Sequence, residues 1–167
     1  MAEKYGVDTL RMAILFGAPP ENDLNFDEKS IQSMKSYLDR VSRLGDKLVS
    51  MLKLEKLQVK ESCLENNSDF LQILKLLQDY ELKISEQRYF HVAIARLMEI
   101  TNILQKIANR DAGSDDKELA TLINGYILLI KGLHPFSPHL SSEIWSNLSN
   151  SLRDLDNDRI QLVDGLK

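Results

Sequence analysis

The strongest candidate metal ligands in this sequence are His134, His139 and Cys63. The two histidines flank a Pro-Phe-Ser-Pro turn, whereas Cys63 is distant in the sequence. A zinc site generally needs four ligands, and no paired cysteine or second histidine motif supplies them. We therefore expect both histidines to be ordinary residues at helix ends and predict no metal site.

The neighbouring Asp115 and Asp116 could act as a catalytic carboxylate pair. The positive end of a helix dipole explains them better, because they precede a helical pattern. The sequence also has no glycine-rich phosphate loop, nucleophile elbow or zinc signature. We predict no catalytic residue and no cofactor in this chain.

Basic side chains could bind phosphate groups, although the formal net charge of the chain is -4. Any contact with a polyanion must therefore come from a local basic face. Arg40, Arg43 and Lys47 follow one another at spacings of three and four, which places them together on a helix surface. The alternative is a solvated face with ion pairs to Asp39 and Asp46. The candidate nucleic-acid contacts are Lys35, Arg40, Arg43, Lys47 and Arg96.

Helices must position these residues, because apolar side chains recur at spacings of three and four along most of the chain. Glycine and prolines at 17–20 end the first helix. The pattern predicts helices over residues 7–16, 26–54, about 68–84, 90–108, about 116–133 and 138 to about 148. Predicted N-terminal caps are Asn25 with Glu28, Ser68, and Ser137 with Pro138 after it.

We predict an all-α fold, an antiparallel bundle of about five to six helices. Residues 1–155 form the bundle, and residues 156–167 are a weakly structured tail in which 160–163 is a weak strand candidate. Apolar residues make up 43% and charged residues 28%, which is a globular balance.

A single cysteine excludes an internal disulfide framework and fits a reducing compartment. The apolar run at 126–130 is much shorter than the roughly 18 residues of a membrane span. The first residues do not resemble a secretory signal.

Three segments resemble motifs of class I aminoacyl-tRNA synthetases of the leucyl, isoleucyl, valyl and methionyl group. Residues 4–11, KYGVDTLR, resemble the Lys-Tyr-Gly-Ala-Asp-x-Leu-Arg stretch of this group. Residues 90–102, FHVAIARLMEITN, resemble its Phe-Asn-x-Ala-Ile-Ala-x-Leu-Met-Glu helix. Residues 133–145, LHPFSPHLSSEIW, resemble its Ala-Pro-Phe-Ala-Pro-His-Ile-x-Glu-Glu-Leu-Trp signature.

A fourth segment favours the leucyl enzymes within the group. Residues 15–26, LFGAPPENDLNF, resemble the Leu-Phe-Ala-Ala-Pro-Pro-Glu-x-Asp-Leu-x-Trp segment of bacterial and mitochondrial leucyl enzymes. Phe26 stands in place of the usual tryptophan, and His134 and Ser137 stand in place of alanines. The resemblance covers about residues 3–148.

The resemblance implies the anticodon-binding helical bundle of a leucyl-tRNA synthetase, which positions tRNA through shape and phosphate contacts. It implies two partners, a leucine tRNA and the missing catalytic domain of a parent enzyme. The His-Ile-Gly-His and Lys-Met-Ser-Lys-Ser motifs of adenylate formation do not occur in this sequence, so we expect no catalysis by this chain alone. We expect a monomer with no membrane contact, in the mitochondrial matrix or the bacterial cytoplasm. The alternative is a free-standing paralogue that acts as a protein- or RNA-interaction module.

Overall fold

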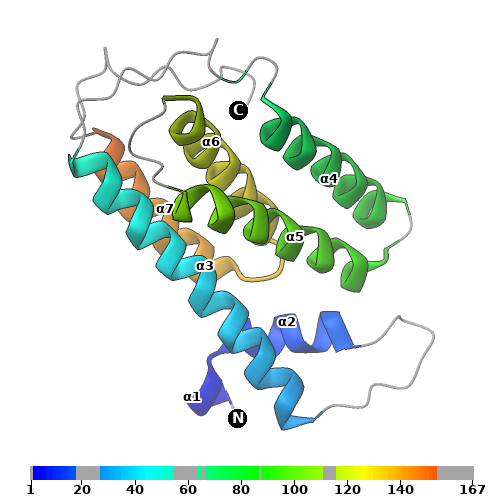
Figure 1. Cartoon of the computed structure of the whole chain (residues 1–167). Coiled ribbons are helices and arrows are strands. Elements are labelled where there is room, and N and C mark those ends of the chain that lie inside the picture. The colour runs from blue at the N-terminus through cyan, green and yellow to red at the C-terminus, as the bar shows by residue number, and fades with distance from the viewer. Residues whose placement is uncertain are drawn as a thin grey trace.

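The computed structural model describes residues 2–17, 27–54, 64, 67–86, 88–110 and 116–153. All regular elements in these ranges are α-helices, which confirms the all-α class (Figure 1). The described helices number seven, more than predicted, because a short helix precedes Gly6. The positive φ of Gly6, 83°, ends that helix before α2 begins. The helices are α1 Ala2–Tyr5, α2 Val7–Gly17, α3 Glu28–Leu54, α4 Ser68–Ser85, α5 Phe90–Asn109, α6 Asp116–Leu133 and α7 Pro138–Arg153.

The long helix α3 is the spine of the molecule. Its 27 residues span about 40 Å at a rise of 1.5 Å per residue. Helices α1 and α2 pack against its first half, while α5, α6 and α7 gather around its second half and α4 packs along α5 (Figure 1). None of the helices that the structure describes is both long and apolar enough to cross a lipid bilayer.

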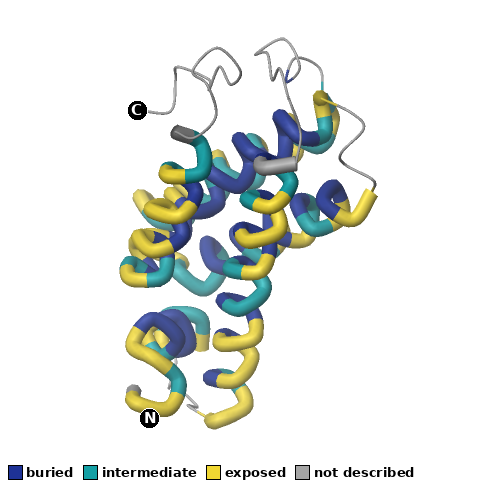
Figure 2. The backbone as a smooth tube through the Cα atoms, turned by 90° about the vertical axis from the view of Figure 1, so that its left-hand side faces the viewer, coloured by how far each residue is buried: buried dark blue, intermediate teal, exposed yellow. Residues whose placement is uncertain are grey.

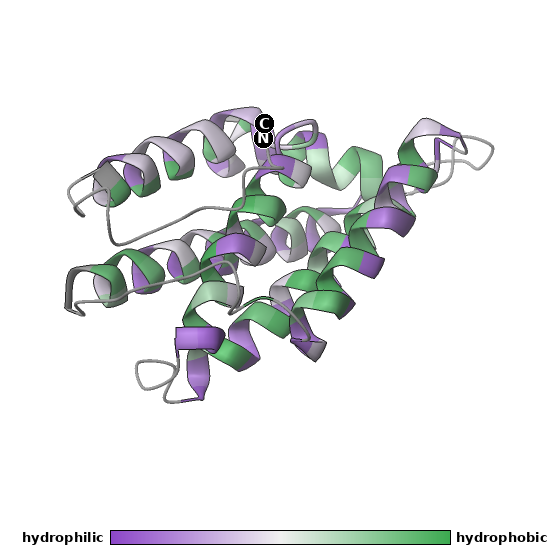
Figure 3. Cartoon of the chain, turned by 90° about the horizontal axis from the view of Figure 1, so that it is seen from above, coloured by the Kyte–Doolittle hydropathy of each residue, from purple (hydrophilic) through white to green (hydrophobic). Residues whose placement is uncertain are grey.

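Helix α6 is the centre of the bundle, and 13 of its 18 residues are buried. Burial extends around most of α6 because α3, α4, α5 and α7 all contact it (Figure 2). On the outer helices, hydrophobic residues concentrate on the faces turned toward neighbouring helices (Figure 3).

Three tyrosine hydroxyls join helices across this core. The Tyr37 hydroxyl lies 3.2 Å from Thr101 Oγ1 and links α3 to α5. Tyr126 donates to the Val41 carbonyl oxygen at 2.9 Å, which links α6 to α3. Tyr80 donates to the carbonyl oxygen of Gly132 at 2.6 Å and links α4 to α6. These bonds satisfy polar groups that burial would otherwise leave without partners.

The structure differs from the sequence-based prediction at the starts of α3 and α4. Asp27 caps α3, since its side chain accepts a hydrogen bond of 2.8 Å from the Ser30 N–H. The predicted cap Asn25 lies outside the described residues. Asn67 caps α4, whereas Ser68, the predicted cap, is the first helical residue. Both observed caps are Asp or Asn, whose short side chains reach the free N–H groups of a first helical turn.

Helix α7 begins at Pro138 as predicted, but the oxygen that caps it comes from elsewhere. The Leu140 N–H donates to Asp8 Oδ2 at 2.8 Å, and the hydroxyl of Ser137 donates to the same oxygen at 3.1 Å. Ser137 thus holds the predicted cap position, because its carbonyl oxygen accepts from the Ser141 N–H at 3.1 Å, but its hydroxyl does not cap the helix. Asp8, on α2, satisfies the first turn of α7 and fixes α2 against that helix.

Several predictions fall on residues outside the described ranges. They concern Cys63, Asp115, the strand candidate at 160–163 and the tail at 156–167. The acidic start of α6 is seen at Asp116, its first residue. The division between a bundle of residues 1–155 and a tail stays a prediction.

Candidate nucleic-acid interface

A row of basic and hydroxyl side chains runs along one face of α3. Its members follow one another at alternating spacings of four and three, the spacing that keeps side chains on one helix face. All are at least partly exposed, and no acidic residue interrupts the row. We call this row the basic stripe; it consists of Lys29, Ser33, Ser36, Arg40, Arg43, Lys47 and Ser50.

The second half of the basic stripe borders a groove between α3 and α5. Arg40, Arg43 and Lys47 line this groove from α3, as predicted from their spacing. Gln105 and Asn109 line it from α5. The groove thus combines cations with amide groups and contains no acidic side chain in its lining. Arginine, lysine and amide side chains are typical donors to the phosphate oxygens of nucleic acids.

Two contacts hold Arg40 and Lys47 in place. The Arg40 guanidinium lies 5.8 Å from the centre of the Tyr37 ring, within the range of a cation–π interaction. Lys47 Nζ donates to Asn109 Oδ1 at 3.0 Å and thereby joins α3 to the end of α5. No ion pair of Arg40 or Arg43 occurs among the described residues, so the predicted pairs with Asp39 and Asp46 are wrong for these arginines, while the alternative of a solvated face stays a prediction.

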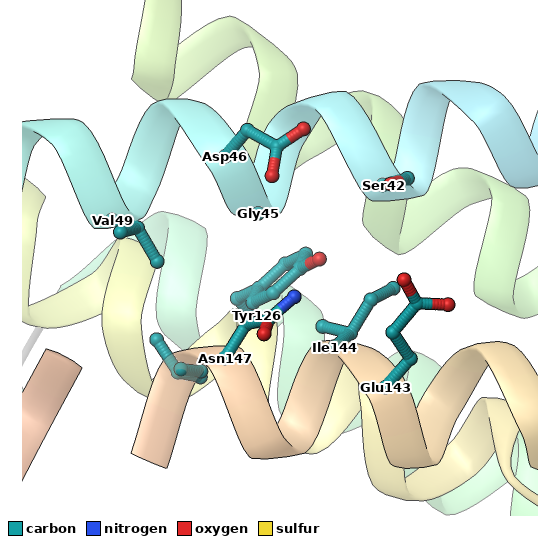
Figure 4. Close-up of a pocket in the computed structure, with 9 residues that line it drawn as sticks. Ser42, Gly45, Asp46, Val49, Tyr126, Glu143, Ile144 and Asn147 are labelled. Carbon is teal, nitrogen blue, oxygen red and sulfur yellow. The ribbon is translucent and has the colours of Figure 1, made fainter. Parts of the chain in front are cut away.

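Acidic residues lie on the other side of α3, toward α7. Asp39 lines a hollow with His139 and Leu140 of α7. Asp46 lines a second hollow with Glu143 and Asn147 of α7, where Figure 4 shows the Tyr126 ring directly below Gly45. In its second half, helix α3 thus carries Arg40, Arg43 and Lys47 toward α5 and Asp46 toward α7. Lys35 is the exception among the cations, since it lines the hollow toward α7 beside Asp39. A polyanion would approach it from the α5 side.

The other two predicted contacts, Lys35 and Arg96, lie outside the groove. Lys35 forms an ion pair with Asp39 at 2.8 Å. Arg96 pairs with Asp79 of α4 at 2.6 Å and with Glu99 at 2.5 Å. These carboxylates compete with any phosphate for the two cations. The pKa of Asp79 is lowered, mainly by its hydrogen bond from Arg96.

The sequence-based prediction misses Gln105 and Asn109. Both lie on one face of α5, four residues apart, at the end of a helix that the sequence predicts correctly. Their polar types carry no signal of a site by themselves. Only the packing of α5 beside α3 shows that they share a groove with the basic residues.

The histidines have the structural surroundings that the sequence predicts for helix ends. His139 Nδ1 lies 2.9 Å from Asp8 Oδ1 at the start of α7, and His134 follows the last residue of α6. The part of the chain that the structure describes contains no group of three or more His, Cys, Asp or Glu side chains that could hold a metal ion.

Comparison with known proteins places this bundle in one family. The family model described as the anticodon-binding domain of tRNA ligase matches residues 72–161. A leucine–tRNA ligase of Trichormus variabilis (strain ATCC 29413 / PCC 7937) is 36% identical over 148 residues, which cover 89% of this chain and 16% of that ligase. The leucine–tRNA ligase of Shewanella sp. (strain W3-18-1) is 28% identical over 90% of this chain and 17% of its own length. The chain thus spans about a sixth of these relatives.

A solved structure agrees with the sequence relatives. It is the ternary complex of the Agrobacterium radiobacter K84 agnB2 LeuRS with tRNA and LeuAMS. The alignment has a TM-score of 0.71 at 26% sequence identity and covers 88% of this chain and 19% of that one. The resemblance to leucyl enzymes that the four motifs carry is therefore confirmed by both sequence and fold. With more than half of its length matched by the family model, the chain belongs to the anticodon-binding domain family of tRNA ligases.

Proposed function

We propose that this chain binds a leucine tRNA through the groove between α3 and α5 and positions it for aminoacylation by the remainder of a leucine–tRNA ligase. The choice of leucine tRNA is supported by the two relatives, which are leucine–tRNA ligases. The choice of tRNA as the ligand is supported by the solved structure of similar fold, which is a complex of a LeuRS with tRNA.

The observation that carries the proposal is the separation of charge on α3. Arg40, Arg43 and Lys47 line one groove together, while Asp39 and Asp46 line hollows on the opposite side. An even mixture of charges would attract a polyanion weakly at best. A row of cations about one helix turn apart can instead follow successive phosphates of an RNA backbone.

The proposal includes the division of labour with the rest of the ligase. The motifs of adenylate formation, His-Ile-Gly-His and Lys-Met-Ser-Lys-Ser, do not occur in this sequence. In this proposal the chain therefore acts as a binding domain, and the remainder of the ligase activates leucine. Its proposed partners are leucine tRNA and the catalytic part of the ligase, and it is proposed to be monomeric by itself. A bacterial cytoplasmic or mitochondrial matrix location follows from the same proposal.

The test is a comparison of charge-reversed variants in a tRNA binding assay. Arg40→Glu combined with Arg43→Glu should weaken the association with leucine tRNA by at least about tenfold, since two phosphate contacts are replaced by repulsion. The control is Arg11→Glu combined with Lys75→Glu, which changes net charge equally at exposed positions of α2 and α4. An equal loss of tRNA affinity in both double variants would show that net charge alone controls binding. No loss of affinity in either variant would refute the groove between α3 and α5 as the tRNA-binding surface.

A further inference from the structure

A further hollow, separate from the two that lie between α3 and α7, is found between the end of α6 and the first turns of α7. Ile130 and Lys131 line it from α6, His134 lines it from the turn, and Ser141, Ser142 and Trp145 line it from α7. The Trp145 side chain is 43% exposed, whereas Tyr126 of α6 and Phe136 of the neighbouring turn are fully buried. An exposed indole beside Ile130 forms an apolar wall that no described residue covers.

The polar side chains of this hollow carry hydroxyl groups or are those of lysine and histidine. Ser141 lies one helix turn before Trp145 on the same face of α7, and its hydroxyl is buried without a hydrogen-bond partner among the described residues. Lys131 and the exposed His134 stand at the rim, and the lining contains no acidic residue. A buried hydroxyl without a partner is unfavourable, and a ligand that supplies a polar group to the Ser141 hydroxyl would remove that cost.

We propose that this hollow receives one unpaired nucleobase of the bound RNA. The base stacks on the Trp145 indole, a polar atom at its edge bonds the Ser141 hydroxyl, and its phosphate lies against Lys131 and His134. The inference rests on the proposed function, because RNA is the ligand in both.

The chemistry of the hollow fits a nucleobase better than an apolar side chain. A base is flat and can cover an indole face, and it carries donors and acceptors at its edge. Stacking on an aromatic side chain does not require a particular base, because every base has a π-face. An apolar peptide segment would leave the Ser141 hydroxyl without a partner and would gain nothing from the Lys131 ammonium group at the rim.

Trp145 is the only tryptophan of the chain, so its fluorescence reports on this hollow alone. The experiment titrates the full chain with leucine tRNA, with a short single-stranded oligoadenylate and with a blunt RNA duplex. A mobility assay follows binding in parallel. Stacking quenches indole emission, so the first two RNAs should quench Trp145 and the duplex, which offers no unpaired base, should bind without quenching.

Variants test the same contact without the fluorescence of Trp145. Binding of labelled oligoadenylate, measured by anisotropy, should weaken by about 5-fold to 150-fold in Trp145→Ala, the range for loss of one stacked base. Trp145→Phe should restore part of the affinity. The matched control is Tyr89→Ala, which removes another exposed aromatic ring far from the hollow in sequence and should leave binding unchanged.

The outcomes separate this inference from the proposed function. Binding of tRNA without quenching of Trp145 would overturn the nucleobase site and leave the groove of α3 and α5 as the RNA surface. Quenching by oligoadenylate without binding of tRNA would support the hollow and contradict the proposed function. If the catalytic part of the ligase shifts the Trp145 emission and RNA does not, the hollow is a protein contact and the nucleobase inference is wrong.

Discussion

The Asp8 carboxylate accepts a hydrogen bond of 2.8 Å from the backbone N–H of Leu140, across 132 positions of the chain. The same carboxylate accepts from the Ser137 hydroxyl and contacts the His139 ring. Asp8 therefore caps α7 from α2 and joins the N-terminal helices to the bundle. This joint adds to the packing of α2 on α3 and α5, the candidate RNA-binding helices.

Replacement of Asp8 by asparagine should destabilise the fold. Asparagine keeps the size of the side chain but offers one carbonyl oxygen where three donors converge. Loss of the negative charge on the acceptor and of one of the three hydrogen bonds should together reduce the free energy of unfolding by roughly 1–3 kcal/mol. The control is Asp39→Asn, which removes only an exposed i,i+4 ion pair and should cost less than about 0.5 kcal/mol. Urea unfolding followed by circular dichroism measures both.

Stability should also fall in acid because of Asp8. Burial raises the pKa of Asp8, but hydrogen bonds from Leu140, His139 and Ser137 outweigh burial and lower the pKa below its usual value. A lowered pKa in the folded state stabilises the protein above the unfolded-state pKa of about 3.9. That contribution is lost as the pH falls through the lower folded-state pKa. The difference between the unfolding free energies of wild type and Asp8→Asn should shrink below about pH 4; a constant difference would contradict this.

Substitution of Gly45 by alanine should disturb the contact between α3 and α6. A Cβ at this position would stand against the hydroxyl of Tyr126, which donates to the Val41 carbonyl oxygen at 2.9 Å. Either the helices separate or Tyr126 loses its bond, so we expect a loss of about 1–3 kcal/mol. The melting temperature should fall by roughly 2–4 °C per kcal/mol for a chain of this size. Gly45→Ala combined with Tyr126→Phe should recover part of the loss, because the clashing oxygen is absent.

Arg96 is a predicted RNA contact whose side chain forms ion pairs with Asp79 and Glu99, so its role can be tested by mutation. It joins α5 to α4 through Asp79 at 2.6 Å. We expect Arg96→Ala to lower the unfolding free energy by up to about 1 kcal/mol, the upper range for a partly exposed pair. Its effect on tRNA binding should be smaller than that of Arg43→Ala. A larger effect would assign Arg96 to the RNA surface and would place α5 beyond the groove in contact with tRNA.

The sequence predicts the helices well where the apolar spacing is regular. The bounds of α2 and α5, the start of α7 and the stop of α6 before His134 follow from periodicity and from glycine or proline, whereas α7 runs to Arg153, about five residues beyond its predicted end. Local rules fail where the decisive partner is remote. Ser137 is a good local cap, but Asp8 supplies the oxygen.

The candidate site shows the same limit. Spacing alone brings Arg40, Arg43 and Lys47 together, because one helix carries all three. It cannot reveal the amides of Gln105 and Asn109, which reach the groove only through the packing of α5 on α3. Nor can it separate these cations from Arg96, whose partner Asp79 belongs to another helix.

The salt dependence of leucine tRNA binding tests the central claim most directly. Each cation that neutralises a phosphate contributes nearly one unit to the slope of log affinity against log salt. The affinity of the wild-type chain should fall with salt with a slope of about −3, and Arg40→Glu with Arg43→Glu should reduce the magnitude of that slope by about two. An unchanged slope in that variant would contradict the assignment of the groove between α3 and α5 as the surface that binds RNA.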